Sequence, residues 1–153
     1  MKFILCCTFA LLLTPITWAQ TLLVMGDSLS AAYNLRQQDG WVSLMSAKLS
    51  QSHPNVNIVN ASVSGETTQG GLARFPALLR KYEPKWVILE LGANDGLRGY
   101  PLETAKSNLS NMIEQAQSTG AKVMVCLVQE LPRPLKVILL RGVGRGDLRR
   151  RFR

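Results

Sequence analysis

The chain has 153 residues, of which 46% are hydrophobic and 18% are charged, and its formal net charge is +8. This length suits a single domain, and the composition is that of an ordinary soluble globular protein. The positive charge is concentrated after residue 130, where eight Arg and Lys residues stand against one Asp, so the excess does not belong to the preceding domain.

The N-terminal segment has the pattern of a secretory signal peptide. Lys2 supplies a positive charge, residues 3–13 are apolar, and the small residues Thr17 and Ala19 stand at the −3 and −1 positions before Gln20. The apolar run is shorter than the roughly 20 residues that a membrane span needs. We therefore predict a signal peptide over residues 1–19 and a periplasmic or secreted protein, with an uncleaved anchor as the alternative.

The cysteines favour neither a disulfide framework nor a metal site. Cys6 and Cys7 would leave with the signal peptide, so Cys126 would be the one cysteine of the exported chain. Its place in an apolar run predicts a buried strand residue. Because no Cys and His stand at the spacing of metal ligands, we expect neither a metal nor another cofactor.

Apolar runs without polar alternation predict strands that are buried on both faces of a sheet. They are Thr21–Met25, Val56–Val59, Trp86–Leu91 and Lys122–Val128. Apolar residues at helical spacing predict helices near residues 41–49, 72–79 and 102–116, with Trp41 and Trp86 as core residues. The alternation of strand and helix predicts an α/β fold, with a parallel sheet and helices on both faces.

The chain after residue 130 breaks this alternation. Leu135–Leu140 is apolar enough for a short strand. The Arg- and Gly-rich residues that follow have no apolar face of period 2 or 3.6, so we predict that they are disordered.

The first of three polar clusters at strand ends is Gly26-Asp27-Ser28-Leu29-Ser30. Gly26 would allow a sharp turn, and Ser28 would stand at the start of a helix, where the dipole favours a developing negative charge. The alternative is that Asp27 or Ser28 is an ordinary helix cap.

The second cluster, Asn60 to Thr68, follows the second predicted strand and is rich in small residues. The backbone N–H of Gly65 could point into a cleft and stabilise an oxyanion. A turn followed by a capping Thr explains this cluster equally well. In both readings, Glu66 is expected to shape the loop and not to take part in the chemistry.

The third cluster, Gly92-Ala93-Asn94-Asp95-Gly96, follows the third predicted strand. The carboxamide of Asn94 is a suitable neutral donor to an oxyanion. The alternative is an Asn-Asp turn. In both readings, Asp95 is expected to shape the loop and not to take part in the chemistry.

Together, the three clusters resemble the motifs of the GDSL, or SGNH, hydrolase family, and most of all its periplasmic bacterial thioesterase and lysophospholipase branch. The resemblance runs from about Thr21 to about Val125. It includes G-D-S-L-S-A-A-Y from Gly26, N-A-S-V-S-G-E-T-T-Q-G-G-L-A-R from Asn60 and L-E-L-G-A-N-D-G-L-R-G from Leu89.

The resemblance implies a flavodoxin-like three-layer α/β/α fold with Ser28 as the nucleophile. It also implies an oxyanion hole made by the N–H groups of Ser28 and Gly65 and by the side chain of Asn94. The implied substrates are acyl esters, acyl thioesters and lysophospholipids. We expect a monomer with no specific nucleic-acid partner.

A general base for Ser28 is missing from the sequence. In the family, the base and its carboxylate come from a D-x-x-H motif near the C-terminus, whereas Asp147 here is followed by Leu-Arg-Arg. The only histidine, His53, is predicted in a loop before the N-terminal end of a strand. Ser28 follows the carboxyl end of the neighbouring strand, roughly 15 Å or more away, so His53 is expected to be a solvated loop residue.

We therefore interpret residues 20–130 as an incomplete SGNH hydrolase domain and residues 131–153 as a basic tail. Our hypothesis is that the C-terminal block is truncated, through a reading-frame shift or a sequencing error, which predicts a nearly inactive chain. Two alternatives stay open. One is a non-catalytic product whose tail binds anionic surfaces. The other is a carbohydrate acetylesterase with the same fold.

Overall fold

The computed structural model describes residues 19–129 and 136–140. The predicted signal peptide, apart from Ala19, and the tail after residue 140 lie outside these residues. Export, the signal peptide and a disordered tail therefore stay predictions. Within the described residues, no helix is long and apolar enough to cross a membrane.

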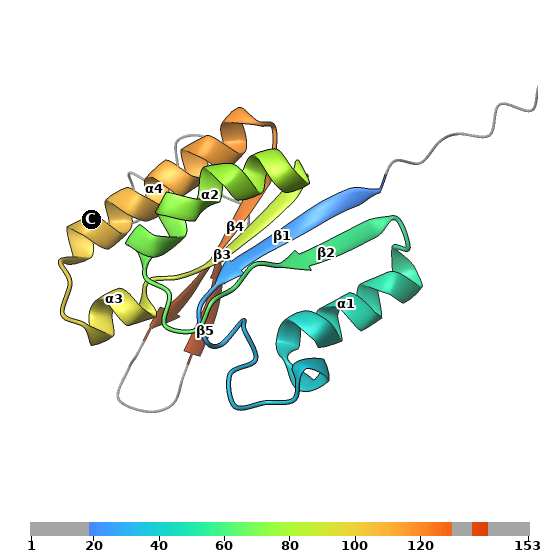
Figure 1. Ribbon diagram of the computed structural model, residues 1–153, viewed down its shortest axis with the longest axis horizontal. Coiled ribbons are helices and arrows are strands. Elements are labelled where there is room, and N and C mark those ends of the chain that lie inside the picture. The colour runs from blue at the N-terminus through green and yellow to red at the C-terminus, as the bar shows by residue number, and fades with distance from the viewer. Residues whose placement is uncertain (1–18, 130–135, 141–153) are drawn as a thin grey trace, which may run out of the picture.

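Five strands form one sheet, in the order β2-β1-β3-β4-β5 (Figure 1). They are β1 (Gln20–Gly26), β2 (Val56–Asn60), β3 (Trp86–Glu90), β4 (Lys122–Gln129) and β5 (Lys136–Leu140). The first four strands are parallel, as predicted, and no bound differs from the predicted one by more than one residue.

β5 confirms the short strand predicted near residues 135–140, but it runs antiparallel to β4. The predicted parallel sheet is confirmed for β1 to β4, and β5 adds an antiparallel strand at its edge. Six residues separate Gln129 from Lys136, whereas a parallel neighbour needs a crossover of roughly a dozen residues or more. A connection this short permits only a hairpin.

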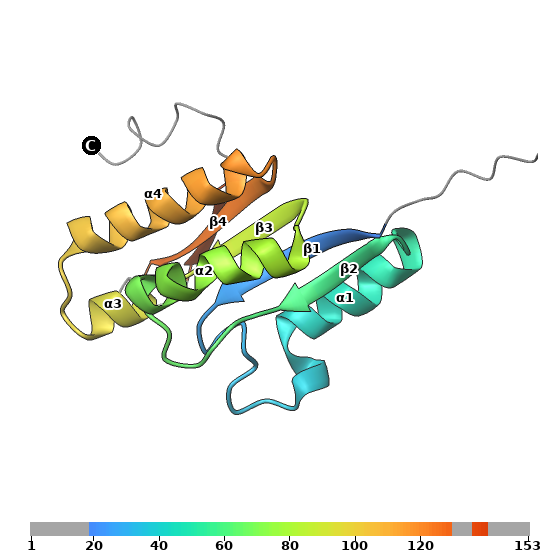
Figure 2. The same cartoon turned by 45° about the horizontal axis from the view of Figure 1, so that its top comes forward.

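The helices form a layer on each side of the sheet. They are η1 (Gln37–Asp39), α1 (Trp41–Ser52), α2 (Thr68–Tyr82), α3 (Ala93–Leu97) and α4 (Leu102–Ser118). Figures 1 and 2 show α2 and α4 side by side on one face of the sheet, with α1 on the other. This arrangement confirms the three-layer α/β/α fold.

Local signals explain the bounds of α2 and α4. The side chain of Thr67 caps α2 by accepting a hydrogen bond from the N–H of Gly70 at 3.2 Å. Pro101 precedes the first residue of α4. Gly120, with a φ of 85°, follows its end in the left-handed region that favours glycine.

Each face of the sheet has its own hydrophobic core. On the side of α2 and α4, the fully buried residues include Leu23, Met25, Phe75, Leu89 and Met112. On the side of α1, the buried residues are Val24, Val42, Ile88 and Cys126. Neighbouring residues of β1 thus enter different cores, which is why the predicted strands show no polar alternation. The prediction that Cys126 is a buried strand residue is confirmed.

Candidate active site

The three polar clusters meet at the carboxyl edge of the sheet. Gly26, at the end of β1, pairs with Glu90, at the end of β3, and Asn60 of β2 pairs with Val24. The clusters after these strands therefore leave the sheet at neighbouring positions. In Figure 1 this edge faces α3, and the loop from α1 to β2 lies at the other end of the strands.

Asn94 ties the three clusters together. Its Nδ2 donates hydrogen bonds to Oδ2 of Asp27 at 3.1 Å and to the backbone carbonyl of Glu66 at 3.0 Å. Asp27 precedes Ser28 and Glu66 follows Gly65, so one amide group joins the neighbours of both other predicted site residues. Both hydrogens of this amide are engaged, and donation to an oxyanion requires one of them to be shared or released.

Ser28 lies in a series of turns over residues 28–34, not at the start of a helix as predicted. The N–H of Ala31 donates to the carbonyl of Asp27 at 2.9 Å, which closes one helical turn. The bond from Tyr33 to the carbonyl of Ser28, at 3.1 Å, then widens the spiral and prevents its continuation as an α-helix. A full helix dipole therefore does not act on Ser28.

Asp27 shapes the turn that presents Ser28. Its side chain is 2% exposed, and its Oδ1 accepts a hydrogen bond from the N–H of Leu29 at 3.0 Å. This local bond is the one that a capping Asp would make. The bond from Asn94 to the other carboxylate oxygen adds a long-range contact that an ordinary cap does not require.

Backbone donors are available at the two positions that the resemblance implied. Within residues 19–129, neither the N–H of Ser28 nor that of Gly65 donates a hydrogen bond, and both residues are half-buried. Gly65 has a φ of 77°, which other residues rarely adopt. Its carbonyl accepts a hydrogen bond from Nη2 of Arg98 at 3.0 Å, which anchors the loop from the far side.

Asp95 joins the third cluster to Thr68, the last residue of the second cluster, through buried hydrogen bonds. It is 2% exposed and accepts two hydrogen bonds from Thr68, from the N–H at 2.8 Å and from Oγ1 at 2.6 Å. Asn108 of α4 donates to the same hydroxyl at 3.0 Å. The prediction that Asp95 shapes a loop is confirmed. Glu66 also has a structural contact, an ion pair with Arg74 at 2.6 Å.

Sequence reasoning missed a buried carboxyl group behind the turn. Glu90 is 5% exposed, and its Oε2 accepts a hydrogen bond from Oγ of Ser30 at 2.8 Å. Burial raises the pKa of Glu90 from 4.5 to about 7, an effect that the Ser30 bond opposes and the nearby charge of Asp27 reinforces. The only sequence signal was a charged residue at the end of an apolar strand.

His53 lies at the opposite edge of the sheet from Ser28. It follows the last residue of α1, is exposed, and contacts Oγ of Ser52 through Nδ1 at 2.9 Å. β1 alone separates the two edges by about 20 Å, at roughly 3.3 Å per residue. The placement of His53 in a loop before the N-terminal end of β2 is confirmed.

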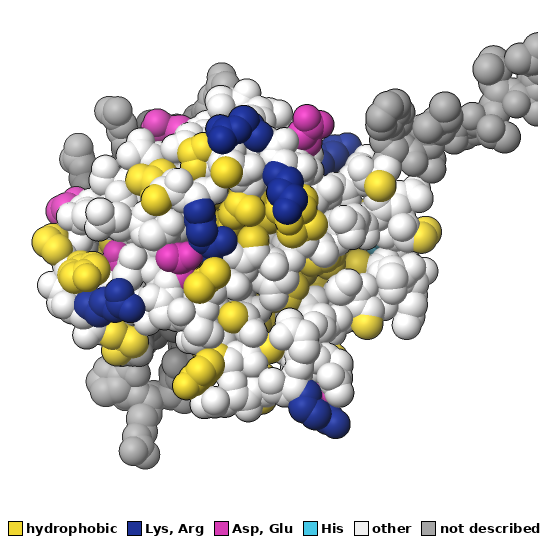
Figure 3. Space-filling view, in the orientation of Figure 1, with side chains coloured by type: hydrophobic (Ala, Val, Ile, Leu, Met, Phe, Trp, Pro, Cys, Tyr) yellow, Lys and Arg dark blue, Asp and Glu magenta, His cyan; other side chains and the backbone are white. Residues whose placement is uncertain are grey.

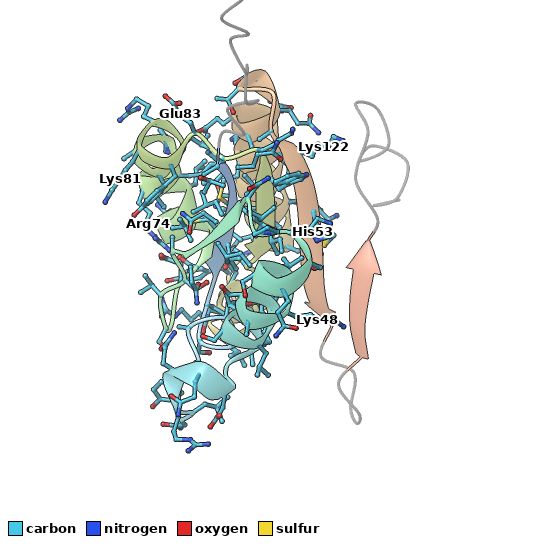
Figure 4. The ribbon with its side chains drawn as sticks, turned by 90° about the vertical axis from the view of Figure 1, so that its right-hand side faces the viewer. Lys48, His53, Arg74, Lys81, Glu83 and Lys122 are labelled. Atoms are coloured by element: carbon cyan, nitrogen blue, oxygen red, sulfur yellow. The ribbon has the colours of Figure 1, made fainter. Side chains whose placement is uncertain are left out.

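His53 also lines an apolar cavity of about 380 Å³ under α1, together with Lys122, Trp86 and aliphatic side chains of the sheet. Figure 4 shows His53 and Lys122 on one side of the molecule, with Arg74 and Lys81 on the other. The cavity lies at the N-terminal ends of the strands and so is not part of the site at Ser28. No cluster of three or more potential metal ligands occurs in the described residues.

Gly26 is required by close packing and not, as predicted, by a turn conformation, since its φ is not positive. A Cβ at this position would lie 2.5 Å from Oγ of Ser30 and 2.8 Å from Oε2 of Glu90. We expect Gly26→Ala to lower the free energy of unfolding by about 1–3 kcal/mol, the usual cost of overpacking. Urea unfolding of this variant and of Gly96→Ala checks this, because a Cβ at Gly96 meets no atom within 4 Å. Equal stability of the two variants would contradict it.

Comparison with known proteins agrees with the geometry. A model of the GDSL-like Lipase/Acylhydrolase family matches residues 24–152, beyond Val125, where we expected the resemblance to end. Esterase TesA of Pseudomonas aeruginosa is 47% identical over 126 residues, which are 82% of this chain and 63% of that protein. An arylesterase of Vibrio mimicus is 45% identical over 74% of this chain and 57% of its own length.

Solved structures show the same fold. The crystal structure of TesA has a TM-score of 0.70 at 49% identity, covering 74% of this chain and 62% of that one. Esterase EstA from Pseudoalteromonas has a TM-score of 0.66 at 45% identity, covering 69% and 58%. The chain thus spans less than two thirds of the length of these relatives. With its family motifs gathered at one sheet edge, it belongs to the GDSL-like lipase and acylhydrolase family.

Proposed function

We propose that the chain carries the nucleophile and oxyanion hole of a serine hydrolase that acts on acyl esters and acyl thioesters. The observation that carries this proposal is the amide of Asn94, bonded to both Asp27 and Glu66. It holds the residues next to Ser28 and Gly65 in one place. These contacts join three strand ends that are far apart in the sequence.

In the proposed reaction, Oγ of Ser28 attacks the carbonyl carbon of the substrate, and the carbonyl oxygen becomes an oxyanion. The free N–H groups of Ser28 and Gly65 are already oriented by the surrounding loops and need no partner exchange to receive this charge. The amide of Asn94 would become the third donor by sharing the hydrogen that it now gives to Asp27 or Glu66.

The attack also requires a group that takes the hydroxyl proton. No imidazole lies at this edge among the residues that the structure describes, because His53 is at the other end of the strands. Both carboxylate oxygens of Asp27 already accept hydrogen bonds, and Glu90 is bonded to Ser30. The described residues thus supply the nucleophile and the donors without the base.

Apolar side chains around the site support a substrate with an acyl chain. Nearly all of the exposed large hydrophobic residues among the described ones follow the carboxyl ends of β1, β2 and β3. They are Leu29, Tyr33, Leu35, Val63, Leu97, Tyr100 and Leu102. Figure 3 shows hydrophobic side chains gathered over α3 and the loop after it. An apolar rim suits an acyl chain better than a carbohydrate ring.

The relatives point to the same chemistry. One is named an esterase, another an arylesterase, and a protein of Escherichia coli is named thioesterase 1/protease 1/lysophospholipase L1. A lysophospholipid therefore belongs among the substrates that we propose. No observation in the described residues favours the tail-mediated binding of anionic surfaces, because most of that charge lies outside them.

A stoichiometric reaction with an alkyl fluorophosphonate tests the proposal without requiring turnover. We expect slow addition of one phosphonyl group over hours at pH 8, located by peptide mass spectrometry on Ser28. Ser28→Ala should abolish this labelling, whereas Ser50→Ala, at an exposed serine of α1, should leave it unchanged. Labelling that persists in Ser28→Ala would refute the proposal.

A further inference from the structure

Glu90 lies directly behind the turn that carries Ser28. It is the last residue of β3, and its main chain pairs with that of Gly26. Its side chain is on the α1 side of the sheet, the same side as that of Ile88 two residues earlier. Only 5% of the residue is exposed, and no Lys, Arg or His forms an ion pair with it in the described part of the chain. Burial of a carboxyl group without a cationic partner costs free energy unless hydrogen bonds compensate for the lost water.

The contacts of Glu90 flank the proposed nucleophile on both sides. Its Oε2 accepts a 2.8 Å hydrogen bond from Oγ of Ser30, two residues after Ser28. The same oxygen accepts a long bond, at 3.4 Å, from the N–H of Asp27, the residue before Ser28. Neither of these hydrogen bonds involves Ser28 itself. Glu90 thus holds the ends of the turn and leaves the serine free.

Ser30 extends this support to two more elements. Its Oγ accepts a hydrogen bond from Nε1 of Trp41, at the start of α1, at 3.2 Å. Its carbonyl accepts a bond from Nδ2 of Asn60, at the end of β2, at 2.7 Å. Ser30 is 1% exposed, so these bonds are shielded from water. The turn is therefore attached to β2, β3 and α1 through one buried serine.

We propose that Glu90 is a positioning residue, whose buried carboxyl group fixes the turn over residues 27–30 and thereby orients Ser28. This inference rests on the proposed role of Ser28 as the nucleophile. Gly26 fits the same account, because a Cβ there would collide with both Ser30 and Glu90. The absence of a Cβ at Gly26 therefore allows the carboxyl group of Glu90 to reach the turn.

The charge state of Glu90 can be followed through this network. The titratable groups that face it are Asp27, on the turn, and Cys126, on β4, whose pKa is raised by burial and further by Glu90. The hydroxyl of Ser30 links Glu90 to the indole N–H of Trp41. Ionisation of Glu90 should therefore change the NMR chemical shift of that indole proton.

The first test follows the indole proton of Trp41, assigned with Trp41→Phe, in the full chain from pH 5 to 9. We expect a titration with a midpoint near 7, the value that burial gives the pKa of Glu90. The titration should vanish in Glu90→Gln and persist in His53→Ala, because His53 lies at the other edge. A titration that survives in Glu90→Gln would overturn the link between Glu90 and the turn.

The second test measures the position of Ser28 itself. Misplacement of a reacting group by about 1 Å can cost 10²-fold in rate, so we expect Glu90→Ala to slow phosphonylation of Ser28 by about 10- to 100-fold. Glu90→Gln keeps an acceptor for Ser30 and should restore most of the rate. Ile113→Val, a buried change on the opposite face, should leave the rate of the folded protein unchanged. Equal rates in wild type and Glu90→Ala would refute the positioning role.

Failure of the proposed nucleophile can be told apart from failure of this inference. If wild type is not labelled at Ser28, hydrogen exchange at the amide of Leu29, which donates to Asp27 within the turn, replaces the rate as the readout. Faster exchange in Glu90→Ala than in Ile113→Val would support the role of Glu90. Equal exchange in the two variants would overturn it.

Discussion

The purified 153-residue chain is expected to hydrolyse p-nitrophenyl butyrate with a kcat about 10⁶-fold below that of a serine hydrolase with a complete nucleophile, base and carboxylate. The physical reason is the position of the only histidine. A serine hydroxyl attacks poorly without a base within hydrogen-bond reach. His53 is placed at the opposite edge of the sheet, where it contacts Ser52. What is left is the rate enhancement from the oxyanion donors and from binding.

Steady-state hydrolysis by the chain, by Ser28→Ala and by His53→Ala measures this. All three should lie far below a complete serine hydrolase, with only the residual enhancement of the oxyanion donors and of binding, and His53→Ala should match wild type. Rapid turnover that disappears with Ser28→Ala would contradict the expectation and reveal a base outside the described residues. Turnover that disappears with His53→Ala would contradict the placement of that residue.

Glu90 is expected to make the stability of the protein depend on pH. Its pKa is raised from 4.5 to about 7 by burial, so between these values the folded state holds a proton that the unfolded state has lost. The free energy of unfolding should therefore fall as the pH rises from 4.5 to 7 and level off above 7. A shift of this size corresponds to a loss on the order of 3 kcal/mol.

Urea unfolding between pH 4 and 8, in wild type and in Glu90→Gln, isolates this contribution. Gln cannot ionise and has nearly the same shape, so the difference between the two proteins cancels other titrating groups. We expect wild type to lose stability relative to Glu90→Gln over this interval. A constant difference would show that the pKa of Glu90 is not shifted. A difference that grows in favour of wild type as the pH rises would show that this pKa is lowered and not raised.

The sheet could be predicted because its strands are apolar on both faces. Leu23 and Met25 enter one core and Val24 the other, and such unbroken runs are hard to mistake for surface strands. The direction of β5 could not be predicted in the same way. An apolar pattern identifies a strand but not its orientation, which here follows from a connection of six residues to β4.

The site was predictable at the level of its three clusters but not of its contacts. The residues Ser28, Gly65 and Asn94 follow three strand ends, and parallel pairing brings such ends together. Which atoms then meet depends on side-chain rotamers. The sequence gives no sign that Asn94 uses both of its N–H hydrogens, or that Trp41, predicted as a core residue, is half-buried and donates to Ser30.

The burial of Glu90 could not be predicted from the sequence for a related reason. A charged residue at the end of an apolar run is usually solvated, since most strand ends are at the surface. Here the turn after β1 folds over the end of β3 and buries it. The carboxyl group fits there because Gly26 has no Cβ. The burial of Glu90 depends on both the turn after β1 and the end of β3, and the sequence of neither segment alone predicts it.

The most direct test of the proposed site is a crystal structure of the chain after reaction with an alkyl fluorophosphonate. We predict a phosphorus atom bonded to Oγ of Ser28, with its oxygen about 2.7–3.1 Å from the N–H groups of Ser28 and Gly65 and from Nδ2 of Asn94. An adduct on another residue would contradict the account. So would an adduct on Ser28 whose oxygen points away from these three donors.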